Sequence, residues 1–329
     1  NAAGTNDGMQ EIDAVITWVD GDCPKHKAKR AKFLALGGHP EAATPLRWEQ
    51  NDEIGYLLRS LDLHAPWLRK VHIVTDEQEP PLGGLSRAIR DKINLVDHRE
   101  IFRGYEEYLP TFNSVSINSV IHRIEGLSDR FILFNDDVIL VGPVLPEDFF
   151  IGDKMVLRGT FGGSMVEGIL YTHHRRNAAN ILGISPENFF RTAHVCIPMI
   201  RSLVEEFYAD NEPVLRANIS HRFRDERQYL PSALSTHLAI LADRAVVREK
   251  KDWHFITAVV CQSGDYDRIR KSFNRLRRRD VKIACINDLS SAKKTVPSVT
   301  WRIARAVEGN EIGAVKYILK RRVFRTVFA

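Results

Sequence analysis

The segment from Phe131 to Leu140 reads FILFNDDVIL, an apolar run that stops on one amide and two carboxylates. The run predicts a buried β-strand, and Asn135, Asp136 and Asp137 follow it directly. In open α/β folds ligands collect at the carboxyl ends of parallel strands, and Mg²⁺ prefers one or two carboxylates together with phosphate oxygens. Asp136 and Asp137 are therefore predicted to hold a divalent metal against a phosphate-bearing substrate. The alternative is that both acids only form a solvated turn or cap a helix.

Other predicted strands also end on acids. Short, almost continuous apolar runs are typical of strands that are covered on both faces. Three such runs, each followed by an acid, are Ala14–Val19 before Asp20-Gly21, Val71–Thr75 before Asp76, and Ile93–Val96 before Asp97. If these strands are parallel, their acidic ends meet the Asp136-Asp137 pair at one edge of a sheet. Four acidic ends together predict a site, whereas one alone would mean little.

Helices are predicted between these strands. The segment Asp52–His64 carries apolar residues at helical spacing on one face. The segment Ser114–Glu125 begins at the cap candidates Asn113 and Ser114 and stops at Gly126. Alternating strands and helices predict an α/β fold with a Rossmann-like, mostly parallel sheet of the nucleotide-binding kind.

The second half of the chain is predicted to insert helices before it returns to the sheet. The clearest helical patterns there are Phe189–Tyr208 and Tyr229–Ala242. Val281–Ile286 then has the pattern of a buried strand that ends in Asn287-Asp288, so we expect it to rejoin the sheet at the same edge. The predicted parts are an N-terminal α/β part (9–148), a mainly helical part (149–245), a return to the sheet (246–290) and a C-terminal tail (291–329).

The tail contains a predicted basic amphipathic helix. In the segment Ala314–Phe328 apolar residues share one face, and Lys316 to Arg325 supply positive charge without any acid. Such a helix either lies on an anionic membrane or docks on its own domain.

Composition narrows the class of protein. The 329 residues carry a formal charge of only +5, so no nucleic-acid partner is expected. The cysteines are far apart and form no CxxC, which argues against a zinc site and fits reduced thiols in a cytosolic protein. No apolar stretch approaches the roughly 20 residues that cross a bilayer, and no signal peptide is visible. We expect a cytoplasmic protein, at the inner face of the membrane if the C-terminal helix binds lipid.

Single residues with catalytic chemistry lie in both halves. His194 is flanked by small and apolar residues, and imidazole suits proton transfer near neutral pH, although buried structural histidines are common. Arg224 in SHRFRDE either pairs with a neighbouring acid or binds a phosphate through its guanidinium fork. His122 and Arg123 lie on the helix that leads to the Asp136-Asp137 strand and could face the same cleft.

Three further residues are donor-side candidates. Trp18 precedes Asp20-Gly21 and could stack on a base, although a tryptophan in the core is commoner. Arg47 and Arg59 flank an acidic cluster, so simple ion pairs could also explain them. The chain has no Walker P-loop, GxGxxG, HExxH or GxSxG, which argues against the common NTPase, dinucleotide, zinc-protease and α/β-hydrolase classes.

The ordered set of segments says more than any single motif. IDAVITWVDG, LRSLDLHAPWLRKVHIVTDEQ, LPTFNS and IHRIEGLSDRFILFNDDV follow one another between residues 12 and 138. This set resembles the Stealth family of hexose-1-phosphate transferases, which includes bacterial capsule polymerases and the animal enzyme that tags lysosomal glycoproteins. Residues 191–207 with 221–226 are similar to the third family region, and residues 283–289 to the fourth.

The resemblance implies a fold of the nucleotide-sugar transferase type, a UDP-hexosamine donor, an oligo- or polysaccharide acceptor, and Mg²⁺ or Mn²⁺. The implied reaction transfers hexosamine-1-phosphate, GlcNAc-1-phosphate in our prediction, to a glycan hydroxyl and releases UMP, in capsule or cell-surface polysaccharide synthesis. By motif position, Asp137, His194 and Arg224 resemble the family's catalytic residues. The donor-side residues that we predict are Trp18, Asp20, Gly21, Arg47, Arg59, Asn113, Ser114, His122, Arg123, Asn135, Asn287 and Asp288. One departure is Ile117-Asn118, where the family usually has Ile-Glu, so a carboxylate is missing.

Two rival functions stay open at this point. A metal-dependent glycosyltransferase of related fold would break the anomeric C–O bond and leave UDP. A non-catalytic carbohydrate- or nucleotide-binding module would bind the donor without turnover.

Overall fold

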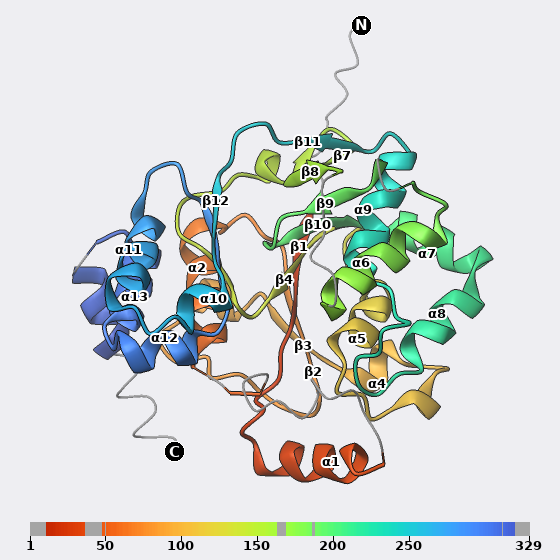
Figure 1. Ribbon diagram of the computed structural model, residues 1–329, viewed down its shortest axis with the longest axis horizontal. Coiled ribbons are helices and arrows are strands. Elements are labelled where there is room, and N and C mark those ends of the chain that lie inside the picture. Colours follow the sequence, from red (N-terminus) through yellow and green to blue (C-terminus); the bar gives the residue numbers. More distant parts are fainter. Residues whose placement is uncertain are drawn as a thin grey trace, which may run out of the picture.

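A five-stranded sheet organises the molecule (Figure 1). The computed structural model describes residues 11–36, 48–49, 51–162, 169–185, 188–310 and 312–319. The strand order is β10-β4-β1-β2-β3, in which β1, β2, β3 and β4 run parallel and β10 is an antiparallel edge strand. The bounds are β1 Ile12–Thr17, β2 Val71–Thr75, β3 Ile93–Asp97, β4 Arg130–Asn135 and β10 Ile197–Ile200. The predicted mostly parallel α/β sheet is confirmed.

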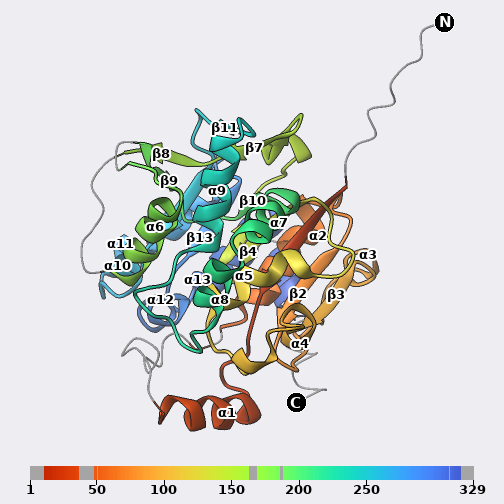
Figure 2. The same cartoon turned by 90° about the vertical axis from the view of Figure 1, so that its right-hand side faces the viewer.

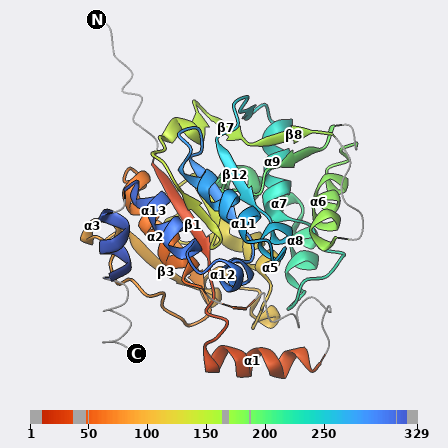
Figure 3. The same cartoon turned by 60° about the vertical axis from the view of Figure 1, so that its left-hand side comes forward.

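Helices cover both faces of this sheet, which explains the almost continuous apolar runs. Along β1 the side chains alternate, with Ala14 and Ile16 in one core cluster and Val15 in the other. The first cluster includes α2 (Glu53–His64) and α13 (Val299–Glu308). The second includes side chains of α5 (Ser114–Val120), α7 (Arg201–Asp210), α8 (Glu212–Ile219) and α9 (Pro231–Leu241). Figure 2 shows this second layer in front of the sheet, and Figure 3 shows α2 and α13 on the other side.

The helix α5 runs from the carboxyl ends of the parallel strands to their amino ends. It lies between the parallel strands β3 and β4, so it begins at their carboxyl edge and ends, through the short 3₁₀ turn Ile121–Arg123, at the amino edge. The predicted helix is confirmed, and it begins at the predicted residue, Ser114. Gly126 has the predicted left-handed conformation, with φ 71°. Asn113 and Ser114 therefore lie at the edge that carries Asp136 and Asp137.

The late strand does not rejoin the main sheet, which corrects our expectation. In the described part of the chain, β13 (Ile283–Ile286) pairs with β12 (Trp253–Ile256) and with β5 (Val138–Leu140) in a separate three-stranded sheet. Because β5 follows the Asp136-Asp137 turn directly, this second sheet continues from the end of β4. The end of β13 still comes close to that turn. The other parts of the predicted division are not tested and stay a prediction.

The segment Phe189–Tyr208 is not one helix, which is a second correction. It forms β9 (Phe190–Thr192), then β10, and only then α7. Pro198 would break a helix at its centre, and the open edge of β4 offers β10 a backbone partner. The helical spacing of the apolar residues was therefore misleading, because a strand buried on both faces has no polar stripe.

The remaining elements complete the two layers. The strands are β6 Phe150–Ile151, β7 Lys154–Leu157, β8 Gly159–Phe161 and β11 Ala245–Val247. The helices are α1 Pro24–Leu34, α3 Arg87–Arg90, α4 His98–Ile101, α6 Leu170–Ile181, α10 Ala258–Cys261, α11 Tyr266–Asn274 and α12 Leu289–Thr295. None of the helices in the described ranges combines the length and apolar composition that a bilayer crossing requires.

The beginning of the predicted C-terminal helix packs on the domain. Residues 312–319 are helical, and the hydroxyl of Tyr317 donates to the carbonyl of Gly55 over 2.8 Å. Ala314 and Tyr317 are buried, whereas Val315 and Leu319 are exposed. Most of the predicted basic face lies outside the described residues, so its membrane contact stays a prediction.

Candidate active site

The turn after β4 holds one carboxylate in a partly enclosed position. The carbonyl of Asp137 accepts a hydrogen bond from the amide of Ile286 over 2.9 Å, which joins the turn to the end of β13. Its Oδ2 atom accepts from the thiol of Cys285 over 3.3 Å. Its Oδ1 atom is buried and has no hydrogen-bond partner among the described residues. A buried carboxylate oxygen without a partner is costly unless a ligand satisfies it.

His194 reaches this carboxylate from the segment between β9 and β10. β10 pairs Ile197 with Leu133, so His194, three residues earlier, lies beside the end of β4. Its Nε2 atom is 3.8 Å from Oδ2 of Asp137. The imidazole stacks on Phe255 with ring centres 5.0 Å apart at 11°, and Tyr171 contacts it from a second direction at 5.6 Å. The ring is thus held in place while 26% of the side chain stays exposed, as a proton acceptor requires.

The side chains around Asp137 fit a hard divalent cation. Asp137, His194 and Cys285 bring three potential ligand atoms within 4.8 Å of one another. Burial raises the pKa of the Cys285 thiol well above its usual range, and the Asp137 carboxylate raises it further. In this arrangement the thiol donates its hydrogen bond to Asp137 and so supports the carboxylate. Carboxylate oxygens of Asp137 and the adjacent Asp136 remain, and these suit Mg²⁺ or Mn²⁺.

Arg224 lies at the same edge, on the side of α5. Its Nη2 atom donates to Oγ of Ser114 over 2.8 Å. The loop that carries Arg224 is fastened to the start of α5, because the amide of Phe112 donates to the carbonyl of Arg222 and the hydroxyl of Ser116 to the carbonyl of His221, both over 2.8 Å. The guanidinium is therefore positioned by the helix that begins at the carboxyl edge.

Asn113 serves the helix and the loop. Its Oδ1 atom caps α5 by accepting from the amide of Val115, as predicted for the helix start. Its Nδ2 atom donates to the carbonyl of His221 and to Oε1 of Gln228, and the side chain is fully buried. Both polar atoms of this amide have partners, so Asn113 supports the loop of Arg224, and its contact with the UDP-sugar stays a prediction.

The turn after β1 is closely packed. The backbone of Asp20 exchanges two hydrogen bonds with the amide of Gln78, and its Oδ1 atom accepts from the amide of Asp22. A Cβ atom on Gly21 would come within 2.3 Å of the Trp48 carbonyl, so only glycine fits there. Trp18 is buried in the core with 7% exposure, and its indole nitrogen has no partner among the described residues. This position fits a tryptophan of the core, which was the alternative to stacking on a base.

The four acidic strand ends meet at one edge, but two of them are neutralised. Lys29 of α1 pairs with Asp76 over 2.8 Å, and Arg99 pairs with Asp97 over 2.8 Å. Asn135 closes β4 opposite Thr17 of β1. The expected cluster of acids therefore narrows to the Asp136-Asp137 turn.

Two predicted donor residues lie away from this turn. His122 is buried at the amino edge, with its ring centre 5.3 Å from that of Tyr208. The guanidinium of Arg123 donates to the carbonyls of Ile101 and Arg103 and lies over the ring of Tyr105. The expectation that both face the cleft of Asp137 is wrong, because α5 ends at the opposite edge of the sheet from where it begins.

Arg59 makes the ion pair that the sequence left as its alternative. It binds Glu308 through Nε at 2.6 Å and Nη2 at 3.1 Å, and it contacts Asp62 at 3.0 Å. This joins α2 to α13 on the back of the sheet. Arg47, the other candidate of this kind, lies outside the described residues.

The turn after β13 lies near Asp137, and several of its polar groups already have hydrogen-bond partners. The amide of Asn287 donates to the carbonyl of Ile256. Asp288 caps α12, accepting from the amide of Ser291 and from Nε2 of Gln262. Burial alone would raise the pKa of Asp288, but these hydrogen bonds outweigh burial and lower it. A ligand role for Asp288 would have to replace the bond from Gln262.

Sequence reasoning missed Cys285 and Phe255, which hold Asp137 and His194 in place. In the sequence Cys285 is one of four widely spaced cysteines, and Phe255 lies in a segment, residues 246–260, that has no clear helical or strand pattern. The signal that could have identified them is their position on two short strands beside the Asn287-Asp288 turn.

The doubly covered, mostly parallel sheet defines a Rossmann-like α/β protein, a class in which ligands bind at the carboxyl ends of the strands. Within that class, the chain carries two conserved regions of the Stealth family. Residues 10–38 match the model of Stealth protein conserved region 1, and residues 47–157 match that of conserved region 2. The similarity of residues 191–226 and 283–289 to the third and fourth regions stays a prediction.

Curated relatives extend the similarity beyond these regions. An exopolysaccharide phosphotransferase of Streptomyces coelicolor is 34% identical over 308 residues, which cover 89% of this chain and 50% of that protein. A capsular polysaccharide phosphotransferase of Haemophilus influenzae is 28% identical over 85% of this chain and 79% of its own length. This chain spans about half the length of the Streptomyces relative. Among solved structures, a galactosyltransferase is 11% identical with a TM-score of 0.42 over 87% of this chain and 95% of its own length.

Proposed function

We propose that this protein transfers hexosamine-1-phosphate from a UDP-sugar to a hydroxyl of a glycan, forming a phosphodiester and releasing UMP. The observation that carries the proposal is the pairing of His194 with Asp137 at the carboxyl edge, 3.8 Å apart, where Asp137 keeps a buried oxygen without a partner in the described chain. The names of the relatives, which are capsular and exopolysaccharide phosphotransferases, support the same reaction class.

The proposed reaction has one bond made and one broken at phosphorus. The acceptor oxygen attacks the β-phosphorus of the UDP-sugar, and the bond from that phosphorus to the oxygen it shares with the α-phosphate breaks, so that UMP leaves. The hydroxyl proton passes to Nε2 of His194, whose ring is held by Phe255 and Tyr171. Positioning and charge stabilisation account for most of the catalysis of phosphoryl transfer.

Three side chains would surround the transferring group. Arg224, held by Ser114, would bind phosphate oxygens with its guanidinium fork. Asp137 and Asp136 would hold Mg²⁺ or Mn²⁺, which when bound neutralises charge on the diphosphate. The acceptor would be an oligo- or polysaccharide, and the product a capsule or cell-surface polymer. We propose a cytoplasmic location, with membrane contact through the basic C-terminal tail.

The test is incubation with a panel of UDP-sugars, glycan acceptors and Mg²⁺ or Mn²⁺. Chromatography identifies the released nucleotide, and ³¹P NMR reads the product. We expect UMP together with a phosphodiester resonance. UDP without a phosphodiester would instead assign a glycosyltransferase, and donor binding without turnover under all conditions would assign a binding module.

A further inference from the structure

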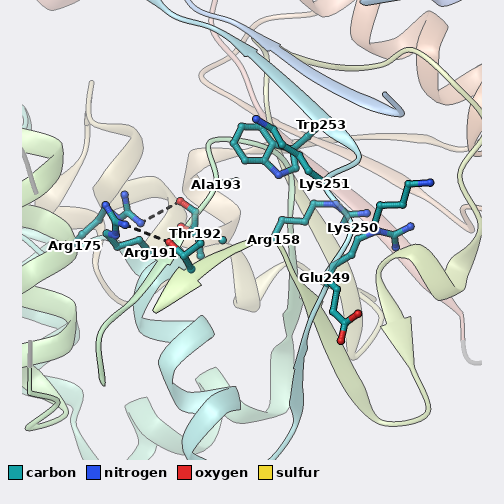
Figure 4. A pocket seen from close by; sticks show the side chains of 12 residues that line it. Arg158, Arg175, Arg191, Thr192, Ala193, Glu249, Lys250, Lys251 and Trp253 are labelled. Atoms are coloured by element: carbon teal, nitrogen blue, oxygen red, sulfur yellow. Dashed lines mark hydrogen bonds between the residues drawn. The ribbon is translucent and has the colours of Figure 1, made fainter. Parts of the chain in front are cut away.

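A second, strongly basic pocket of about 410 Å³ lies beside the candidate active site. It is formed by β8, α6, β9 and the segment that leads into β12. Its lining contains one acid, Glu249, and six cations, which are Arg158, Arg175, Arg191, Arg248, Lys250 and Lys251. Figure 4 shows Arg175 and Arg191 on one side of the pocket and Lys250 and Trp253 on the other.

Two of these cations belong to buried ion pairs and build the wall. Arg158 binds Asp252 through two hydrogen bonds of 2.8 and 2.7 Å, and both side chains are almost fully buried. Arg248 pairs with Asp148 over 2.9 Å and with Asp252 over 3.0 Å. These pairs balance their own charge, so the excess positive charge comes from the other lining residues.

Arg175 is the least compensated of them. Its Nη2 atom donates to the carbonyl of Thr192 over 3.1 Å, while its Nε atom is buried without a partner among the described residues. No carboxylate in the described ranges forms an ion pair with it. Burial lowers the pKa of Arg175, and the like charge of Arg191 lowers it further. A buried guanidinium next to a second one is unfavourable until an anion binds between them.

The pocket adjoins His194. Thr192 and Ala193 line it, and His194 is the next residue. Trp253 also lines it, and Trp253 and Phe255 lie on the same face of β12, since side chains alternate along a strand. Phe255 stacks on His194. Trp253 is two residues before Phe255 on the same strand, which is a distance of about 7 Å, so the pocket lies about 7 Å from the stacked rings.

We propose that this basic pocket binds a phosphodiester of the acceptor glycan, next to the hydroxyl that reacts. The inference rests on the proposed function, in which His194 takes the proton of the acceptor hydroxyl. The molecule beside His194 is then the acceptor, and the proposed reaction itself places phosphodiesters in the growing glycan. Arginine forks and lysines together match such a group. The enzyme would accordingly prefer an acceptor that already carries its own product linkage.

The test measures binding alone, by isothermal titration calorimetry on the whole chain. The two probes are a GlcNAc disaccharide joined by a phosphodiester and a neutral GlcNAc disaccharide. The main variant, K250Q/K251Q, removes two exposed charges from the pocket. The matched control, K70Q/R90Q, removes two exposed charges that precede β2 and β3, at the other end of the strand order from β10. A second variant, R175Q, probes the buried guanidinium, and its unfolding transition is checked first.

We expect the unaltered protein to bind the phosphodiester probe about tenfold or more tightly than the neutral one. K250Q/K251Q should lose most of that preference, R175Q should lose it as well, and K70Q/R90Q should keep it. The affinity for UDP-GlcNAc should stay unchanged in all three variants.

Three results would overturn the inference. Equal affinity for both probes would show that the pocket does not read the phosphate. Inorganic phosphate that competes as well as the disaccharide would assign a simple anion site. A parallel loss of UDP-GlcNAc affinity in K250Q/K251Q would assign the pocket to the donor. Since no turnover is needed, an absence of UMP release would count against the proposed function and leave this result intact.

Discussion

The thiol of Cys285 donates to Oδ2 of Asp137 over 3.3 Å, and the amide of Ile286 donates to the carbonyl of the same aspartate over 2.9 Å. A strand of the second sheet thus holds the turn at the end of the first. One carboxylate oxygen is fixed by these bonds, and Oδ1 is left for a ligand. The position of Asp137 therefore depends on Cys285, which lies 148 residues later in the chain.

Substitutions at this contact distinguish the role of Asp137, which would bind the metal, from that of Cys285, which holds Asp137 in place. We expect Asp137→Asn to lower UMP release by about 10²–10³-fold, because an amide cannot supply the charge that the diphosphate site needs. Cys285→Ala should cost less than about tenfold, since a thiol is a weak donor. Steady-state UMP release under saturating Mg²⁺ measures both. Equal losses in the two variants would contradict the assigned roles.

The bond between Arg224 and Ser114 predicts a non-additive pair. Ser114→Ala should lower kcat/KM by about five- to thirtyfold, the loss of one hydrogen bond to a charged group. Arg224→Gln should cost more. The double variant should be no worse than Arg224→Gln alone, because Ser114 is a positioning residue that acts through Arg224. Arg224→Lys tests the fork, and full activity in it would contradict bidentate phosphate binding.

Arg59 is expected to affect stability and leave donor binding unchanged. Its side chain is 20% exposed and that of Glu308 only 7%, so Arg59→Gln leaves a mostly buried carboxylate without its partner. We expect the free energy of unfolding in urea to fall by about 1–3 kcal/mol. The control is Arg87→Gln, whose pair with Asp91 is exposed, with an expected change of less than about 0.5 kcal/mol. A raised KM for the UDP-sugar in Arg59→Gln would restore Arg59 as a donor residue.

Acid pH should destabilise the fold through His122. Burial lowers the pKa of His122 from 6.5 to about 3, so the folded protein keeps this ring neutral. Below pH 6.5 the unfolded chain binds a proton that the folded chain refuses, so stability is complete above that pH and falls as the pH drops towards 3. The slope for one such group is at most about 1.4 kcal/mol per pH unit.

Urea unfolding of His122→Gln across this pH range tests the assignment. The variant should show a shallower pH slope than the unaltered protein, because glutamine does not titrate. His98, whose pKa burial lowers to about 4, should supply part of the slope that remains. Identical slopes in both proteins would contradict the role of His122.

Local patterns in the sequence are enough to predict the parallel strands and the acids that follow them. β1, β2, β3 and β4 were predicted because each is a short apolar run, and an apolar run is a local property of the chain. Parallel pairing then places their carboxyl ends at one edge, so the Asp136-Asp137 turn could be identified as the candidate site. The family motifs lie in the same segments, since they too are contiguous in the chain.

Which residues come together at the site depends on how the elements pack in three dimensions. Lys29 neutralises Asp76, and α5 carries His122 to the wrong edge, because both depend on how helices pack against the sheet. Because β10 pairs antiparallel with β4, His194 lies beside Asp137. β13 belongs to a second sheet, from which Cys285 donates to the same carboxylate. Strand partners and edge contacts join residues far apart in the chain, and a pattern of neighbouring residues carries no information about them.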